Sequence, residues 1–439
     1  MTKVCVIGAG HIGSVLAAVL AEAGLSVTAI DIDQRRIDGF LQGSVPIAEP
    51  GLQEIVDAGL ANGNLAFSTS FDACGDADVI LVTVGTPLAE DLTPDLSHVE
   101  TVAGQLEGHV RDGQLIMVKS TVPPGTTRDV FAKRLSTQAK VHVAFSPERL
   151  AEGAAIREAK TLPIVVGGID EDSTAKAAEF WRSALNLEVI EVASPESAEM
   201  VKLADNLWID LNIALAHDLA KLCDALPYPL DVLEVIRGAN SLKKGQHYVN
   251  ILTPSNGVGG YCLTKDPWFV DALGKWNGAE LMTPATSRRV NDSMPEYCVA
   301  QIKKFLDQKG IAAKDAKVAV LGYAFKTNSG DVRLTPVQPF LDALESAGIG
   351  EIAVFDPMVL DHDAKRAGIE LSPSSRDAMD QADCVAFLVG HDAIRSIDAA
   401  TVAASAKPGA LVFDGRMYFT PDEIATMRDK GLAYQGVGR

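Results

Sequence analysis

A cysteine in a glycine-rich segment is the residue whose type and setting point most directly to chemistry. Residues 256–267 read NGVGGYCLTKDP, with glycines ahead of Cys262 and Lys265 shortly after it. Glycines let a backbone come close to another group. A nearby cation and a helix start lower the pKa of a thiol, which can then act as a nucleophile. A cysteine is more often a small core residue, and we assign that role to Cys5, Cys223 and Cys384.

Two further groups of polar residues could act on a reacting carbon. Lys202 and Asn206 are four positions apart on a predicted helix, so both project from one face and can donate to a developing oxyanion. The segment SPERLAEG at residues 146–153 follows a predicted strand and carries Glu148 and Glu152 at the strand end, where ligands collect. The alternatives are a solvated surface lysine in the first case and ordinary helix-start charges in the second.

A second glycine pattern, GAGHIG at residues 8–13, predicts a dinucleotide site. Its spacing suits a tight turn, close approach of the backbone to a pyrophosphate, and close packing of helix on strand. The glycines are Gly8, Gly10 and Gly13. Asp31 ends the next predicted strand, where a carboxylate binds ribose hydroxyls and repels a 2′-phosphate, which favours NAD over NADP. Arg35 and Arg36 are close in sequence and could instead receive such a phosphate.

The elements that must hold these residues are predicted by apolar runs. Runs typical of buried parallel strands, with helical patterns between them, occupy residues 3–7, 27–30, 79–84, 114–118 and 141–145. The pattern restarts with strands at residues 317–322, 352–356 and 384–389 and a helix over 336–347. We therefore expect an α/β fold with two Rossmann-like, doubly wound parallel-sheet domains.

A long central helix is predicted between the two domains. Ser194 suits its N-cap and Pro195 its first position, and Pro227 ends it. Its apolar surface is broad enough to be covered on more than one side, so we expect it to bridge the domains and to form a homodimer. The expected divisions are an NAD-binding domain at residues 1–193, a central helical dimerisation segment with the cysteine at 194–300, and a C-terminal Rossmann-like domain at 301–439.

Composition excludes several classes of protein. The 439 residues are 47% hydrophobic with a net charge of -19, so the chain can bury large cores and would be repelled by nucleic acids and anionic membranes. The six cysteines are far apart and show no metal-like spacing with histidine, so we expect neither disulfides nor a metal site. No signal-peptide pattern occurs, and no apolar run reaches the roughly 18–20 residues of a membrane span. We expect a cytoplasmic protein.

Taken in order, these segments resemble the UDP-glucose/GDP-mannose dehydrogenase family. The matching segments are GAGHIG, VGTP at 84–87, KSTVPPGTT at 119–127, SPERLAEG, Lys202 with Asn206, GVGGYCLTKDP at 257–267, and LGYAFK at 321–326 with Asp331 and Arg333. The resemblance covers nearly the whole chain. It implies an NAD-dependent enzyme that oxidises the C6 primary alcohol of a nucleotide sugar to a carboxylate, and a C-terminal domain that binds the nucleotide sugar.

The resemblance also implies the catalytic residues. They are a thiol nucleophile that holds the aldehyde as a thiohemiacetal and then a thioester, a lysine and an amide for the oxyanions, a carboxylate and a hydroxyl that hold water, and two carboxylates for proton transfer and the substrate. In that order they match Cys262, Lys202, Asn206, Asp266, Thr121, Glu152 and Glu148.

Binding residues follow from the same resemblance. The implied cofactor contacts are Gly8, Gly10, His11, Ile12, Gly13, Asp31, Arg36, Thr86, Thr121, Glu152, Lys265 and Arg333. The implied substrate contacts are Glu148, Arg149, Leu150, Lys202, Asn206, Tyr248, Gly259 and Lys326.

The identity of the sugar stays open at this stage. Residues 241–248 read SLKKGQHY where many relatives have an arginine that reaches the partner's substrate diphosphate, and Lys243 or Lys244 could substitute without bidentate geometry. The segment VNDSMP at 290–295 resembles the branch that acts on UDP-N-acetylhexosamines such as UDP-GlcNAc or UDP-ManNAc, whereas residues 261–265 are closer to the UDP-glucose branch. We expect an N-acetylated substrate, with UDP-glucose and GDP-mannose as alternatives.

Two other classes of protein share parts of this pattern. A single-step hydroxyacid dehydrogenase has a similar layout and a lysine–asparagine pair, but it would not need Cys262. A non-catalytic nucleotide-binding protein is less well supported, because both the cofactor motif and the nucleophile motif are intact.

Overall fold

The computed structural model describes residues 1–47, 49–245 and 247–439, and its chain separates into two compact units. Unit 1 comprises Met1–Asp205 and Trp268–Ala279, and unit 2 comprises Asn206–Pro267 and Glu280–Arg439. The chain passes from one unit to the other inside two helices, α9 (Pro195–Ala225) and α11 (Asp266–Trp276). The division into three parts at residues 193 and 300 stays a prediction.

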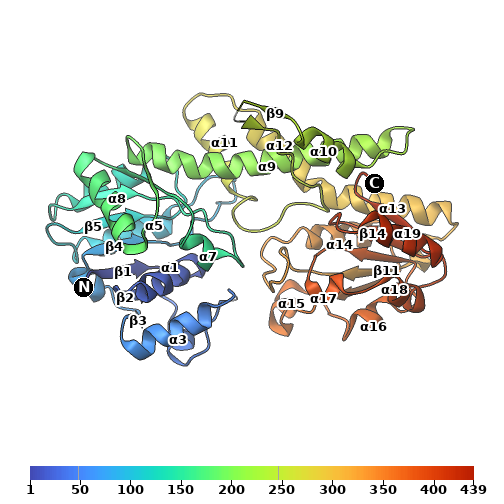
Figure 1. Ribbon diagram of the computed structural model, residues 1–439, viewed down its shortest axis with the longest axis horizontal. Coiled ribbons are helices and arrows are strands. Elements are labelled where there is room, and N and C mark those ends of the chain that lie inside the picture. The colour runs from blue at the N-terminus through green and yellow to red at the C-terminus, as the bar shows by residue number, and fades with distance from the viewer. Residues whose placement is uncertain (48, 246) are drawn as a thin grey trace. The chain divides into compact units, whose positions relative to one another are not determined.

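The described strands of unit 1 form one sheet in the order β3-β2-β1-β4-β5-β6-β7-β8 (Figure 1). The strands are β1 (Lys3–Ile7), β2 (Ser26–Ile30), β3 (Leu65–Ser68), β4 (Val79–Val82), β5 (Leu115–Val118), β6 (His142–Phe145), β7 (Ile164–Gly168) and β8 (Val189–Glu191). The expected doubly wound parallel sheet is confirmed, with β6 and β7 as an antiparallel pair that the apolar runs did not predict. Neighbouring β1 and β4 mark the point where the strand order reverses, which is where such sheets bind ligands.

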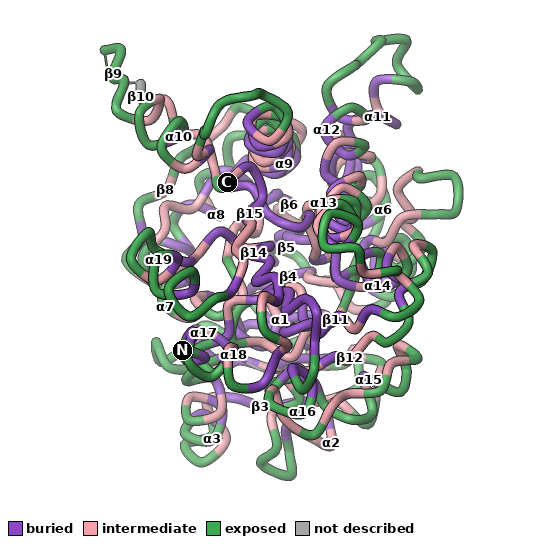
Figure 2. Tube along the Cα trace, turned by 90° about the vertical axis from the view of Figure 1, so that its right-hand side faces the viewer, coloured by how far each residue is buried: buried purple, intermediate pink, exposed green. Residues whose placement is uncertain are grey.

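Helices cover both faces of this sheet because its strands are apolar on both sides. Val4 and Val6 of β1 pack into a core with α1 and α8, whereas Cys5 and Ile7 face a second core with α5. The central strands β4 and β5 are buried along their whole length (Figure 2). The helices of this unit are α1 (His11–Glu22), α2 (Gln34–Leu41), α3 (Leu52–Asn62), α4 (Asp72–Asp76), α5 (Ser97–Leu106), the π-helix η1 (Thr127–Ala132), α6 (Lys133–Leu135), α7 (Ala155–Ala159) and α8 (Glu171–Leu185).

Unit 2 contains the second predicted Rossmann-like sheet. Its described strands are all parallel in the order β12-β11-β13-β14-β15. They are β11 (Lys317–Leu321), β12 (Glu351–Phe355), β13 (Cys384–Phe387), β14 (Leu411–Asp414) and β15 (Ala433–Gly436). The helices around them are α10 (Val232–Asn240), α12 (Thr283–Asp292), α13 (Met294–Gln308), the 3-10 helix η2 (Ala313–Asp315), α14 (Val337–Ser346), α15 (Asp361–Ala367), α16 (Ser375–Met379), α17 (Asp392–Arg395), α18 (Ala399–Ser405) and α19 (Pro421–Asp429).

The glycine turns of the two sheets are built alike. In unit 1, Gly8 has φ +98° and the amide of Ala9 donates to Asp31 at 2.9 Å. In unit 2, Gly322 has φ +97° and the amide of Tyr323 donates to Asp356 at 2.6 Å. A carboxylate at the end of the second strand therefore holds each turn.

The long helix α9 has the predicted boundaries. The Ser194 hydroxyl accepts from the Ser197 amide at 3.2 Å, Pro195 is the first helical residue, and the helix ends at Ala225 before Pro227. A two-stranded hairpin, β9 (Lys243–Lys244) and β10 (His247–Tyr248), follows α10. None of the helices in the described residues combines the length and apolar character of a bilayer span.

Gly13 in the first turn of α1 is the glycine with the least room. A β-carbon there would lie 1.8 Å from the carbonyl oxygen of Gly8 and 2.6 Å from the Thr83 hydroxyl, whereas one on Gly10 would meet nothing within 4 Å. We expect Gly13→Ala to lower the melting temperature by about 4 °C or more, because overpacking of this kind costs about 1–3 kcal/mol.

The matched control for this variant is Gly10→Ala, which should melt within about 1 °C of the wild type because φ at Gly10 is -72°. Differential scanning calorimetry without cofactor measures both. Equal melting temperatures for the two variants would contradict the packing account.

Candidate active site

The glycine turn of unit 1 opens onto a cavity of about 300 Å³ at the carboxyl ends of β1 and β4. Its lining includes the predicted cofactor residues Gly8, Gly10, Asp31 and Arg36. His11, Ile12 and Gly13 follow directly as the first turn of α1, whose N-terminal amides favour an anionic group. The backbone at Gly10 is open to close approach, since no atom lies within 4 Å of the place a β-carbon would take. These residues fit a bound dinucleotide.

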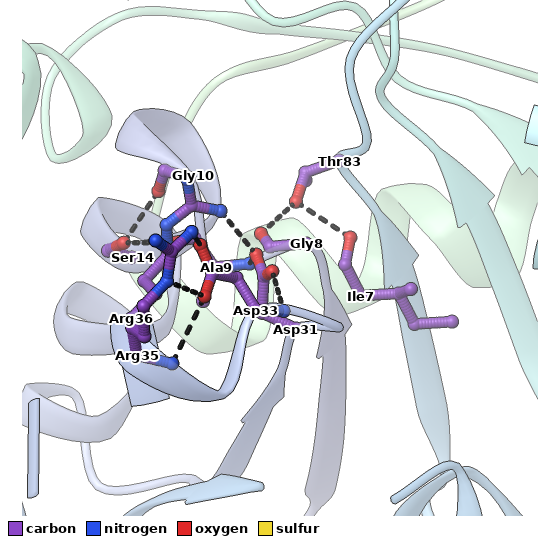
Figure 3. Close-up of polar contacts among 10 residues, drawn as sticks. All are labelled: Ile7, Gly8, Ala9, Gly10, Ser14, Asp31, Asp33, Arg35, Arg36 and Thr83. Carbon is purple, nitrogen blue, oxygen red and sulfur yellow. Dashed lines mark hydrogen bonds and ion pairs between the residues drawn. The ribbon is translucent and has the colours of Figure 1, made fainter. Parts of the chain in front are cut away.

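Asp31 accepts three hydrogen bonds at this cavity (Figure 3). Its Oδ2 accepts from the Ala9 amide at 2.9 Å and from Arg36 Nη1 at 2.8 Å, and its Oδ1 accepts from the Asp33 amide at 3.0 Å. Arg36 is thus paired with the carboxylate that would face a ribose, which weakens its attraction for a 2′-phosphate. Arg35 points to Asp33 instead and is 91% exposed. The geometry fits NAD better than NADP.

Glu49 is a residue at this site that sequence reasoning missed. Its buried carboxylate lies 3.0 Å from His11 Nε2 and accepts from the backbone amides of Gly153 at 2.6 Å and Ala155 at 2.8 Å. It therefore joins the start of α1 to the loop that carries Glu152. No sequence signal marks Glu49, because its partners lie more than 30 positions away along the chain.

The ends of β4 and β5 bring two predicted residues together. The hydroxyl of Thr86 donates to the carbonyl of Thr121 at 2.6 Å. The turn after Thr121 is held by Glu199 of α9, which accepts from the amides of Gly125 and Thr127, each at 2.7 Å. Burial raises the pKa of Glu199 to about 7.

The SPERLAEG segment is anchored by a buried lysine. Lys119 Nζ donates to the Ser146 carbonyl at 3.0 Å and lies 4.9 Å from the ring centre of Trp181. Burial lowers the pKa of Lys119 to about 8, and the charge of Glu148 acts in the opposite direction. The Glu148 carboxylate also accepts from the Leu150 amide, and Arg149 donates to the Pro163 carbonyl. Glu148, Arg149 and Leu150 therefore lie together, in unit 1.

In unit 2, Cys262 lies in the turn that begins α11. Its carbonyl accepts from the amides of Lys265 at 3.2 Å and Asp266 at 2.9 Å, and the residue is exposed. The positive end of a helix favours a thiolate. By contrast Cys5, Cys223 and Cys384 are buried, as expected.

A buried carboxylate gathers three predicted residues beside this turn. Asp266 is fully buried and accepts from Lys265 Nζ and from the Asn206 amide nitrogen, each at 2.5 Å. Lys202, one turn before Asn206 on α9, is 6% exposed, which excludes the alternative of a solvated surface lysine. The ammonium of Lys265 is paired with Asp266, so its predicted effect on the Cys262 thiol and its cofactor contact stay predictions.

The glycines before Cys262 approach other parts of unit 2. A β-carbon on Gly259 would lie 2.6 Å from Pro336 Cδ, and one on Gly260, where φ is +85°, would lie 2.6 Å from the Phe325 ring. The expectation that these glycines permit a close approach is thus met by protein neighbours in the second Rossmann-like domain. Phe325 immediately precedes Lys326, so the cysteine loop packs beside a predicted substrate residue.

A cavity of about 250 Å³ lies along this loop, and Gly259, Phe325 and Arg416 are part of its lining. Sequence reasoning missed Arg416, although it follows the end of β14 at a position where ligands collect in parallel sheets. Burial lowers the pKa of its guanidinium. Arg416 supplies a local cation in a chain whose net charge is -19.

Other predicted residues lie apart from this cavity's lining. Arg333 is exposed and donates through Nε to Asp331 at 2.9 Å. Tyr248 is 64% exposed on the β9–β10 hairpin, with Lys243 Nζ 5.2 Å from its ring centre. Gln246 of the 241–248 segment lies outside the described residues. A substrate contact by Lys243 or Lys244 stays a prediction.

Comparison with known proteins gives matches along nearly the whole chain. Residues 2–185 match the NAD binding domain, 196–293 the central domain and 319–421 the UDP binding domain of the UDP-glucose/GDP-mannose dehydrogenase family.

Individual relatives agree with these matches. The chain is 34% identical to a UDP-N-acetyl-D-mannosamine dehydrogenase of Methanocaldococcus jannaschii, over 90% of this chain and 87% of that protein. It is 32% identical to an NDP-N-acetyl-D-galactosaminuronic acid dehydrogenase of Ralstonia solanacearum, over 90% and 92%. A solved UDP-D-ManNAc dehydrogenase from Pyrococcus horikoshii aligns with a TM-score of 0.89 at 28% identity, over 100% of this chain and 99% of that one.

The Asp31 geometry predicts how cofactor affinity responds to mutation. We expect Asp31→Asn to weaken NAD binding about 10- to 100-fold, because a charge-assisted hydrogen bond to a ribose hydroxyl contributes about 1.5–3 kcal/mol. Isothermal titration with NAD and NADP measures the effect, and the preference for NAD over NADP should narrow. Asp33→Asn, two positions later in the sequence, is the control, and its dissociation constant for NAD should stay within about threefold of the wild-type value. A similar loss in both variants would contradict a specific role for Asp31.

Proposed function

Because this chain belongs to the UDP-glucose/GDP-mannose dehydrogenase family and is an NAD-dependent nucleotide-sugar dehydrogenase, we propose that it oxidises C6 of a UDP-N-acetylhexosamine from alcohol to carboxylate. The observation that carries the proposal is an exposed thiol, Cys262, in the turn that begins α11. The N-acetylated sugar is supported by the names of two relatives, a UDP-N-acetyl-D-mannosamine dehydrogenase and an NDP-N-acetyl-D-galactosaminuronic acid dehydrogenase. UDP-glucose is the alternative, and a cytoplasmic location stays a prediction.

The thiol has a defined part in such a reaction. A bound NAD would supply the hydride acceptor for C6 of the alcohol, whose hydroxyl proton passes to water, and a second NAD would supply it for C6 of the thiol adduct. Between these events the Cys262 thiolate adds to the aldehyde carbon, a carbon–sulfur bond forms, and the carbonyl oxygen becomes an alkoxide. After the second oxidation the adduct is a thioester. Water then adds to its carbonyl carbon, the carbon–sulfur bond breaks, and the thiolate leaves with release of the carboxylate.

Lys202 and Asn206 are proposed to stabilise the oxygen that becomes negative in these steps. Both are buried on α9 one turn apart, so their donors would act where water is largely excluded and electrostatic stabilisation is strong. The Asn206 side-chain nitrogen donates to Asp266, and this hydrogen bond fixes the orientation of the amide group. Asp266 also accepts from Lys265 Nζ, and we propose that it helps to hold a water at the reacting carbon.

The proposed substrate carries a diphosphate and needs cations. Arg416 and Phe325 line the cavity along the cysteine loop, and Lys326 is the next residue after Phe325 in the sequence. We propose Arg416 and Lys326 as the residues that neutralise the diphosphate.

The predicted roles of Thr121, Glu148 and Glu152 rest on resemblance to the family. Support from unit 1 is that Thr86 is bonded to Thr121 and that Glu49 anchors the loop bearing Glu152. We propose that Glu152 moves the proton during hydrolysis and that Glu148 contacts the substrate.

We also propose that α9 forms a homodimer. One face of this helix is exposed along its length at positions that repeat every three or four residues, and six of the seven side chains are apolar: Met200, Ala204, Trp208, Leu211, Leu215, Asp218 and Leu222. Trp208 is 50% exposed and Leu222 54% exposed. An apolar stripe of this kind on a helix is typical of a protein–protein interface, with a second copy of the chain as the partner.

Substitution of the nucleophile tests the proposed chemistry. We expect Cys262→Ser to lose steady-state turnover about 10³-fold or more, because a hydroxyl has a much higher pKa and rarely reacts as an alkoxide. NADH absorbance with a panel of UDP- and GDP-sugars, together with mass analysis of the product, measures activity and identifies the sugar.

Cys223→Ser is the matched control, since this thiol lies in the core of unit 2 and the variant should keep wild-type turnover. Full turnover by Cys262→Ser would remove sulfur from the mechanism. Wild-type activity on hydroxyacids but on no nucleotide sugar would favour the single-step class.

The dimer proposal predicts a change in mass. Trp208→Glu combined with Leu215→Glu should convert a dimer to a monomer in size-exclusion chromatography with light scattering, because two charges would face the partner helix. Ala175→Glu on the exposed face of α8 adds a charge away from the stripe and should leave the dimer intact. A wild-type monomer, or a double variant that stays dimeric, would contradict the proposal.

A further inference from the structure

A buried chain of hydrogen bonds in unit 2 joins the two ends of the cysteine loop. The loop runs from Ser255 to Leu263, and the chain of bonds between these ends passes through His217, Asn291, Asp210 and Arg288. His217 and Asp210 are on α9, and Asn291 and Arg288 are on α12. All four side chains are at most 1% exposed. No role in the reaction described above uses them.

In the first half of this hydrogen-bond network, every bond runs from donor to acceptor in the same direction, from Ser255 toward Asp210. The Ser255 amide donates to His217 Nε2 at 3.1 Å, so the other ring nitrogen carries the proton and donates to Asn291 Oδ1 at 2.8 Å. Asn291 in turn donates to Asp210 Oδ1 at 2.7 Å. Burial lowers the pKa of His217 to about 3, so the imidazole is neutral at working pH. The start of the loop is thus tied to Asp210 through two oriented side chains.

Arg288 completes the second half. Its Nη1 donates to Asp210 Oδ1 at 2.6 Å and to the Leu263 carbonyl at 3.2 Å, and its Nη2 pairs with Asp292. Leu263 immediately follows Cys262. A guanidinium is planar and always charged, so its donors hold the carboxylates and the carbonyl in a defined plane. The Leu263 carbonyl is therefore held by the Arg288 guanidinium, which is itself held by Asp210 and Asp292.

The loop needs such support because its own backbone is weakly determined. Gly257 has φ +134° and Gly260 φ +85°, and glycine populates many backbone conformations at similar free energy. A cavity of about 540 Å³ borders the loop at Val258 and Thr264 and the network at Arg288, so close packing does not hold this side. Hydrogen bonds at the two ends therefore add to the restraint that Pro336 and Phe325 impose on Gly259 and Gly260.

We propose that Arg288 is a positioning residue that sets the place of the Cys262 thiol through the Leu263 carbonyl, with Asp210, Asn291 and His217 orienting it. The inference rests on the proposed function of Cys262 as the nucleophile. Loss of Arg288 lets the thiol leave its position at the start of α11. The effect falls mainly on the chemical steps, since all the predicted cofactor contacts except Lys265 and Arg333 lie in unit 1.

The test compares Arg288→Met and Arg288→Lys with the wild type. The matched control is Arg289→Met, because Arg289 is the next residue on α12, is exposed, and donates to Thr286. Measurements are kcat, KM for NAD, and the rate at which iodoacetamide alkylates Cys262 at pH 7 without substrate, followed by peptide mass spectrometry. The alkylation rate reports on the thiol whether or not the enzyme turns over.

We expect Arg288→Met to lower kcat about 100-fold with KM for NAD changed less than about threefold, since a misplacement of about 1 Å has effects of this size. Alkylation of Cys262 should slow about fivefold as the thiol loses the helix N-terminus. Arg288→Lys should recover part of both losses, because it keeps the charge and one donor. Arg289→Met should match the wild type in every measurement.

Several results would overturn the inference. A folded Arg288→Met variant with kcat and alkylation rate within about threefold of the wild type would do so, as would equal losses in kcat for Arg288→Met and Arg289→Met. If Arg288→Met does not fold, His217→Phe tests the other end of the network, and an unchanged alkylation rate there counts against the proposal. A wild type inactive on all nucleotide sugars whose Cys262 alkylation still depends on Arg288 would refute the proposed function and leave the positioning role supported.

Discussion

The carboxylate of Asp266 is the group on which the geometry around Cys262 depends. It is fully buried, and a buried charge without partners would cost several kcal/mol. Its partners are the Lys265 ammonium and the Asn206 amide nitrogen, so the cost is offset only while the cysteine turn and α9 stay together. The same bonds keep Asn206 facing the turn that starts α11. Stability and the arrangement of reactive groups therefore depend on one side chain.

The same hydrogen-bond arrangement has a different role in each of the two Rossmann-like sheets. In both, a carboxylate at the end of the second strand accepts amide hydrogens of the glycine turn. Asp31 is partnered by Arg36 and faces a cavity, as a ribose-binding group should. Asp356 is instead buried against His391 Nε2 at 3.1 Å, and His391 also accepts from the Asn328 amide at 2.8 Å. Asp356 at the second turn therefore has a protein side chain as its partner, and that partner, His391, also holds the loop that follows Lys326.

Local signals in the sequence predicted much of this fold. Gly13 could be predicted because the close contact of helix and strand is made within a few residues, and Ser194 with Pro195 predicted the start of α9 correctly. Cys262 stood out for the same reason. Residues whose partners are distant in the sequence were missed: Glu49 has no local motif, and the acceptor of Arg288 on α9 is 78 positions away.

The contacts of some predicted residues could be identified only from the fold. Lys265 was predicted to act on the thiol three positions before it, which stays a prediction, and only the fold shows that its ammonium also contacts Asp266. The glycines of the loop were predicted to approach some group, but only the fold identifies Phe325 and Pro336 as the residues that leave no room for a β-carbon.

The central claim is that sulfur at position 262 carries the sugar between two oxidations. Counting NADH per molecule of limiting UDP-N-acetyl-D-mannosamine, with the product mass, tests it most directly. The account predicts two NADH and a carboxylate, whereas one NADH and a carbonyl product would contradict it.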